Sequence, residues 1–122
     1  MKHVNTILLV NDIEVSKRFY SETLGLKLRD DWKTMVVYEG DLALHQAGEL
    51  QPKDLTARFT TTGPQGHGNV VIYLQSEDLD ACFADLQQRG VEILHGIVTL
   101  PWERLFRVKD PDGYIIEIGE AR

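Results

Sequence analysis

Apolar and polar positions follow one order along the first half of the chain. An apolar run over residues 4–10 predicts a strand. Apolar side chains then recur at helical spacing up to Gly25, and Asn11 and Asp12, followed by Glu14, predict an N-terminal cap. Three short strands are predicted after this helix: residues 26–28, 33–38 and 42–46. The order is one strand, one helix and three strands.

The second half repeats this order. Residues 70–75 predict a strand, and Ser76 to Asp78 supply the cap of a helix that ends at Gly90. The apolar stripe of this helix consists of Leu79, Cys82, Phe83 and Leu86. Strands are then predicted at residues 91–94, 104–108 and 114–118, and His95 reads as a turn residue.

Two independent landmarks support an internal duplication. Asp12 and Asp78 are 66 positions apart, and Gly25 and Gly90 are 65 positions apart. The pattern predicts one α+β domain over residues 1–122, built from two βαβββ modules. The first module covers about 1–46, a crossover loop about 47–68, and the second module about 69–122.

Composition narrows the function only slightly. The 122 residues carry a net charge of −6 without a basic stripe, which argues against nucleic acid as a partner. No apolar run approaches the roughly 20 residues that cross a bilayer, and the first residues resemble a strand more than a signal peptide. We therefore expect a cytoplasmic protein without a membrane partner. Cys82 is the only cysteine, which excludes an internal disulfide, and its place on the helix stripe predicts a packed side chain.

Three segments carry a resemblance to a known family. They are NDIEVSKRFYSETLGLKL at 11–28, EDLDACFADLQQRGVEI at 77–93 and PWERLFRVKDPDGYIIEI at 101–118. They resemble the vicinal oxygen chelate superfamily of glyoxalase I, extradiol dioxygenases, and fosfomycin- and bleomycin-resistance proteins. The resemblance implies a curved mixed sheet around a cavity, with the helices on the outside. It also implies a homodimer whose cavities are formed partly by both chains.

Metal-dependent members of that superfamily take ligands from the first strand of each module and from the last strand of the second. By this resemblance Glu117 matches the last ligand position, while Asn5 and Val71 occupy the other two. Valine cannot bind a metal, and a catalytic divalent ion needs about three protein ligands. We therefore expect no cofactor. The alternative is a divalent metal ion held by His3, His45 and Glu117.

Strand alternation places Glu117 on one face with Ile115 and Gly119, and the resemblance makes this the cavity face. Glu117 would serve there as a counter-ion or a general base, or it would form a structural ion pair with Arg104 or Arg107. Each tryptophan is a candidate for ligand stacking or for the core. The candidate ligand-binding residues are Asn5, Ile7, Trp32, His45, Phe59, Tyr73, Trp102, Arg104 and Glu117.

The function that we expect is that of a small-molecule-binding protein resembling the bleomycin-resistance branch. It would sequester a hydrophobic or cationic aromatic ligand without a metal, with Trp32 and Trp102 stacking, Asn5 and Tyr73 hydrogen-bonding, and Glu117 supplying charge. One alternative is a metal-dependent lyase, isomerase, or thiol or glutathione transferase of the glyoxalase type, with Glu117 as the catalytic residue. Another is a regulatory domain that binds a metabolite.

Overall fold

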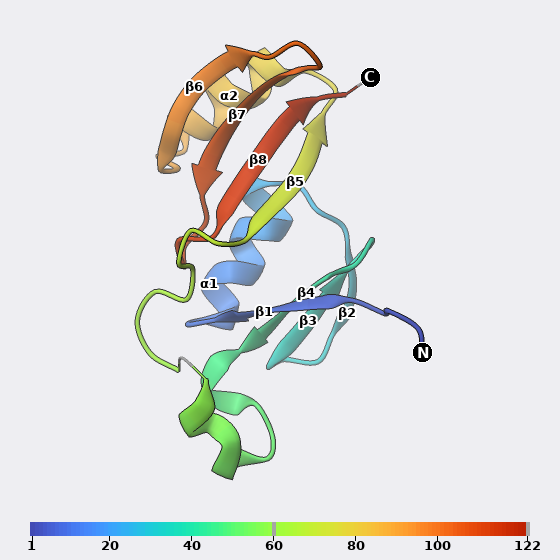
Figure 1. Cartoon of the computed structure of the whole chain (residues 1–122), viewed down its shortest axis with the longest axis vertical. Helices are drawn as coiled ribbons and strands as arrows, with labels where there is room; N and C mark the ends of the chain where they lie inside the picture. Colours follow the sequence, from blue (N-terminus) through green and yellow to red (C-terminus); the bar gives the residue numbers. More distant parts are fainter. Residues whose placement is uncertain (60, 122) are drawn as a thin grey trace. The chain divides into compact units, whose positions relative to one another are not determined.

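The computed structural model describes residues 1–59 and 61–121, and the side chains of residues 55–57 lie outside the description. Two compact units make up the chain, Met1–Gln65 and Gly66–Arg122. Each unit contains one four-stranded mixed sheet and the helix that follows its first strand (Figure 1). The predicted α+β class and its two βαβββ modules are therefore confirmed.

The first unit has the strand order β1-β4-β3-β2. β1 runs parallel to β4, and the other neighbours are antiparallel. Two short 3₁₀ helices, η2 and η3, follow in the segment that was predicted as a crossover loop. The elements are β1 (Thr6–Val10), α1 (Ile13–Arg18), η1 (Phe19–Thr23), β2 (Leu28–Asp31), β3 (Met35–Tyr38), β4 (Leu42–Gln46), η2 (Ala47–Glu49) and η3 (Lys53–Arg58).

The first helix begins where the sequence predicts but changes its winding halfway. The Asp12 carboxylate accepts from the backbone N–H of Glu14 at 3.1 Å, as an N-cap residue should. After Arg18 the helix widens into η1, a π turn. The Tyr38 hydroxyl donates to the Lys17 carbonyl at 3.2 Å, so a side chain from β3 inserts into the helical hydrogen-bond ladder. This tertiary contact explains the wider turn, which helical spacing alone does not reveal.

The second unit has the strand order β5-β8-β7-β6, with β5 parallel to β8. Asp78 caps its helix by accepting from Ala81 N–H at 3.0 Å. β6 is longer than predicted because its pairing with β7 continues to Thr99, across two register irregularities. The elements are β5 (Val71–Ser76), α2 (Leu79–Gln88), β6 (Ile93–Thr99), β7 (Arg104–Lys109) and β8 (Ile115–Glu120).

Helix α2 lies along one face of its sheet (Figure 1). Its Phe83 ring meets the Phe106 ring of β7 edge-on, with ring centroids 5.0 Å apart. Leu79 and Leu86 are buried, whereas Cys82 is only half-buried, and burial raises the pKa of its thiol. The strand residues buried in this unit include Leu105, Phe106, Val108, Ile116 and Ile118. The other face of the sheet is free of α2.

The turn before β8 is held by a buried carboxylate. Asp110 Oδ1 accepts from the N–H of Asp112 at 2.9 Å and from the N–H of Tyr114 at 2.8 Å. Gly113 adopts a φ of 88° in this turn, a left-handed conformation that favours glycine. Burial raises the pKa of Tyr114 to about 12, and the negative charges of Asp112 and Asp110 act in the same direction. The turn thus fixes the start of β8, the strand that carries Glu117.

No helix in the described part of the chain is long and apolar enough to cross a lipid bilayer.

Candidate functional site

Four polar side chains form a row across the α2-free face of the second sheet. The strand register aligns His95 of β6 with Arg107 of β7, Arg107 with Glu117 of β8, and Glu117 with Tyr73 of β5. Successive strand residues point to opposite faces, and Phe106 packs on α2, so Arg107 points away from the helix. We call His95, Arg107, Glu117 and Tyr73 the polar row. His95 is thus a strand residue within β6, and its prediction as a turn residue was wrong.

Arg107 links two members of the polar row. Its Nε donates to Glu117 Oε1 at 2.9 Å, and its Nη2 lies 2.8 Å from the same oxygen. Its Nη1 lies 3.1 Å from His95 Nε2. Because a guanidinium only donates, His95 Nε2 is the acceptor, and its Nδ1 donates to the Gly96 carbonyl at 2.7 Å. This pattern corresponds to a neutral imidazole, and the positive charge of Arg107 offsets the negative charge of Glu117.

A second hydrogen-bonded pair lies beside the polar row. The Tyr73 hydroxyl donates to Glu103 Oε2 at 2.8 Å and accepts from Gln75 Nε2 at 2.9 Å. The Glu103 carboxylate and the Tyr73 hydroxyl both lie next to Gly119 of β8. A Cβ built at position 119 would come 2.5 Å from Glu103 Oε2 and 2.9 Å from the Tyr73 hydroxyl oxygen. We call Tyr73 and Glu103 the Tyr–Glu pair. The absence of a side chain at position 119 makes room for it.

Glu103 was missed by the sequence reasoning. It precedes β7 in a turn, where neither strand alternation nor helical spacing assigns a direction to its side chain. The available signal was Gly119, which alternation places on the same face as Glu117 without a side chain of its own. A glycine inside a strand often marks the close approach of another group.

Exposed apolar side chains accompany the polar row. Val71 and Val98 share the face with the polar row, and their exposed fractions are 52% and 39%. Trp102, next to Glu103 in the turn before β7, is 64% exposed. A surface of this kind suits a ligand with an apolar or aromatic body and few polar groups.

Of the two predicted partners of Glu117, Arg107 forms the ion pair. Arg104 lies on the opposite, helix-covered face, since its Nη2 meets Asp80 of α2 at 2.9 Å and its Nη1 meets Glu120 at 2.8 Å. The hydrogen bond from Arg104 lowers the pKa of Asp80. The structure therefore separates Arg104, predicted as a ligand-binding residue, from the face that carries Glu117.

The other predicted site residues lie in the first unit. Trp32, in the turn between β2 and β3, is 67% exposed. Neither Trp32 nor Trp102 is therefore a core residue. Ile7 and Phe59 are 44% and 42% exposed, and Asn5 is half-buried just before β1. His45 of β4 makes a contact of 2.9 Å from Nδ1 to the Gln46 carbonyl oxygen.

The residues present do not fit the metal site that the resemblance implies. Val71 offers no ligand atom, and Glu117 Oε1 already accepts from the Arg107 guanidinium. His3 Nε2 lies 3.2 Å from Thr6 Oγ1, and His45 Nδ1 lies 2.9 Å from the Gln46 carbonyl oxygen. Over residues 1–59 and 61–121, no three His, Cys, Asp or Glu side chains are grouped so that they could hold a metal ion.

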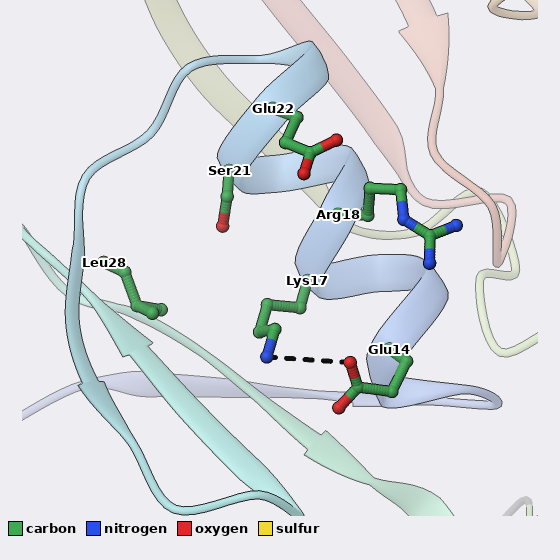
Figure 2. Close-up of a pocket in the computed structure, with 6 residues that line it drawn as sticks. All are labelled: Glu14, Lys17, Arg18, Ser21, Glu22 and Leu28. Atoms are coloured by element: carbon green, nitrogen blue, oxygen red, sulfur yellow. Dashed lines mark ion pairs between the residues drawn. The ribbon is translucent and has the colours of Figure 1, made fainter.

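A separate pocket of about 340 Å³ lies between α1–η1 and β2 in the first unit. Figure 2 shows Lys17, Ser21 and Leu28 pointing into the space between the helix and the strand. The Lys17 Nζ lies 3.0 Å from Asp31 and 3.6 Å from Glu14, and the hydrogen bond to Asp31 raises the pKa of Lys17. Its charge is thus already matched, and none of the predicted site residues lines this pocket. The lining residues are Glu14, Lys17, Arg18, Ser21, Glu22 and Leu28.

The Arg107–Glu117 pair is expected to stabilise the fold measurably, because Glu117 is only 19% exposed. A double-mutant cycle of Arg107→Met and Glu117→Gln, followed by urea unfolding, should give a coupling free energy of about 1 kcal/mol or more. The matched control is the Arg89–Asp85 pair of α2, whose side chains are 49% and 51% exposed. An exposed pair of this spacing contributes about 0.3–0.5 kcal/mol. Equal coupling in the two cycles would contradict the expectation.

Comparison with known proteins places this architecture in a family. Residues 3–122 match the model of the glyoxalase-like domain. A virulence protein, STM3117, of Salmonella typhimurium is 28% identical over 93% of this chain and 80% of its own length. A lactoylglutathione lyase of Schizosaccharomyces pombe is 25% identical over 93% of this chain, and the chain spans only 45% of that protein.

Solved structures agree with this placement. A protein of unknown function from Agrobacterium tumefaciens superimposes with a TM-score of 0.84 and 37% identity, over 100% of this chain and 95% of the other. A glyoxalase/bleomycin resistance protein/dioxygenase from Nocardioides gives a TM-score of 0.75 at 23% identity, over 98% of this chain and 83% of the other, a likeness of fold alone. With two βαβββ modules and a family match over nearly its whole length, the chain belongs to the glyoxalase-like domain family of the vicinal oxygen chelate superfamily.

Proposed function

We propose that the face carrying the polar row binds a small, partly apolar organic molecule without using a metal ion. The observation that carries this proposal is the ion pair between Arg107 and Glu117. Glu117 corresponds to a metal ligand in metal-dependent relatives. In this chain its carboxylate pairs with the guanidinium of Arg107 and not with a metal ion. Binding alone requires no Lewis acid, so it is compatible with a valine at position 71.

The surroundings of the polar row support the same proposal. Val71 and Val98 offer apolar contact area, and Trp102 offers an exposed indole on which a flat ligand can stack. Sequestration of such a ligand, as in the bleomycin-resistance branch, is the function that we favour. We also propose a homodimer, in which a second copy of the chain completes the ligand site.

A glyoxalase-type lyase is the competing function, favoured by the resemblance to the yeast lactoylglutathione lyase. That chemistry would need metal ligands beyond those that the matching positions provide. Metal analysis of protein purified without chelator tests it directly. Stoichiometric metal that is lost in Glu117→Ala would overturn the metal-independent proposal.

Ligand binding itself is tested by tryptophan fluorescence titration with a panel of cationic and neutral aromatic compounds, in the presence of EDTA. We expect at least one compound to quench the fluorescence at micromolar concentration. The quenching should be lost in Trp102→Phe. Trp32→Phe is the matched control, since Trp32 is similarly exposed and does not belong to the sheet that carries the polar row. If no compound binds, or if quenching follows Trp32 alone, the proposed face is not the ligand site.

A further inference from the structure

We propose that Glu103, held by Tyr73, selects ligands that carry a positive charge, such as an organic ammonium or a cationic heteroaromatic ring. This inference rests on the proposed function and specifies the class of ligand. It assigns the charge recognition to Glu103 instead of Glu117.

The charges of the face lead to this assignment. The charge of Glu117 is neutralised by Arg107. The Lys109 Nζ lies 3.6 Å from Glu92 Oε2, so this lysine also has an acidic partner. Among the described residues of the second unit, 66–121, Glu103 has no ion-pair partner. His95 is neutral in this hydrogen-bond pattern and supplies no positive charge. The Glu103 carboxylate is therefore a negative charge on this part of the face that no described positive side chain of this unit balances.

The hydrogen bonds of the Tyr–Glu pair fix the carboxylate in place. Tyr73 gives its single hydroxyl proton to Glu103 Oε2 and accepts a hydrogen bond from Gln75. Within the described part of the second unit, Glu103 Oε1 accepts no hydrogen bond, so it retains the capacity to accept one from a ligand. The carboxylate is thus oriented in advance, which reduces the entropic cost of ligand binding.

Gly119 determines where this charge lies. The Glu103 carboxylate packs against the main chain of β8, next to the ion-paired Glu117 two residues away, and does not extend freely into water. A cation bound there would meet a carboxylate, and Trp102, the preceding residue in the chain, has an exposed indole. Carboxylate and aromatic groups are the usual partners of organic cations in proteins.

The experiment compares two probes of almost the same shape, N-methylquinolinium, which is cationic, and 1-methylnaphthalene, which is neutral. Binding is measured by fluorescence titration at low ionic strength, where charge interactions are least screened. We expect wild-type protein to favour the cation. Glu103→Gln keeps the size and the acceptor for Tyr73 but removes the charge, so it should weaken cation binding about tenfold and leave the neutral probe unchanged.

Gly119→Ala tests the placement independently of the charge. The added methyl group displaces the end of the flexible Glu103 side chain, so the fold should persist while cation selectivity falls. The matched control is Gly96→Ala in β6, where the nearest atom to the new Cβ is in the Phe83 ring at 4.0 Å. Asp85→Asn on α2 controls for net charge, because it removes one negative charge on the helix side of the unit. Neither control should change the preference for the cation.

The outcomes separate the two proposals. Equal binding of both probes by wild-type protein, or selectivity that survives in Glu103→Gln, would overturn the role of Glu103 while leaving a ligand-binding face. Absence of binding by either probe and by the wider aromatic panel would instead overturn the proposed function, and the role of Glu103 with it. Loss of selectivity in both Glu103→Gln and Gly119→Ala, with both controls unaffected, would establish the inference.

Discussion

Gly66→Ala is expected to lower the free energy of unfolding by about 3 kcal/mol, because a side chain at this position would overlap the main chain of a neighbouring turn. A Cβ at position 66 would lie 2.5 Å from the Tyr114 nitrogen and 2.6 Å from the Gly113 oxygen. Both are main-chain atoms of the turn that precedes β8. They cannot move aside by a change of rotamer, as the end of a flexible side chain can. The backbone must shift, and the hydrogen bond from Gly66 N–H to the Asp112 carbonyl, now 2.9 Å, would be strained.

Urea unfolding followed by circular dichroism measures this effect. Gly48→Ala is the matched control, since a Cβ there meets no atom within 4 Å and the residue has no positive φ. The control should stay within about 0.5 kcal/mol of the wild type. Equal midpoints for Gly66→Ala and Gly48→Ala would show that the contact between residue 66 and the turn is dispensable.

Asp110→Ala is expected to cost about 2–4 kcal/mol, because two backbone N–H groups lose their acceptor at once. Asp110 is only 6% exposed, and its Oδ1 serves both Asp112 and Tyr114. Water cannot easily replace a buried acceptor of this kind. The loss should also loosen the start of β8 and hence the position of Glu117.

Asp110→Asn separates the hydrogen bonds from the charge. The amide oxygen can take the place of Oδ1, so this variant should retain most of the stability that Asp110→Ala loses. Thermal unfolding of the three proteins, together with hydrogen exchange at the amides of Asp112 and Tyr114, measures both effects. Identical losses in the alanine and asparagine variants would show that the charge, and not the hydrogen bonds, stabilises the turn.

Glu117 illustrates which structural features a sequence pattern can predict and which it cannot. Alternation and the DPDG turn placed it on one face of the last strand, and the structure places it on the face away from α2. The choice between Arg104 and Arg107 as its partner depended on register, which pairs Arg107 with Glu117. β7 and β8 are consecutive strands, and their register is fixed by the geometry of the turn that joins them, which the local pattern did not resolve.

The helix ends give a similar contrast. Asp12 and Asp78 cap their helices as the sequence indicates, since a cap involves neighbours two or three residues away. The π turn after Arg18 was not predicted, because it depends on a contact with Tyr38 of β3. The exposure of Trp32 and Trp102 likewise depends on turns whose surroundings the sequence does not specify.

By itself, the sequence determined the two βαβββ modules, the capped helix starts and the family resemblance, because each depends on local spacing or on short motifs. Only the tertiary structure decided that Arg107 neutralises Glu117 and that Glu103 reaches Tyr73, thirty positions away, across the bare backbone of Gly119. The first pairing depends on the register of two consecutive strands, and the second on a strand and a turn that are distant in the chain. Their geometry therefore follows from packing and register, which no local pattern encodes.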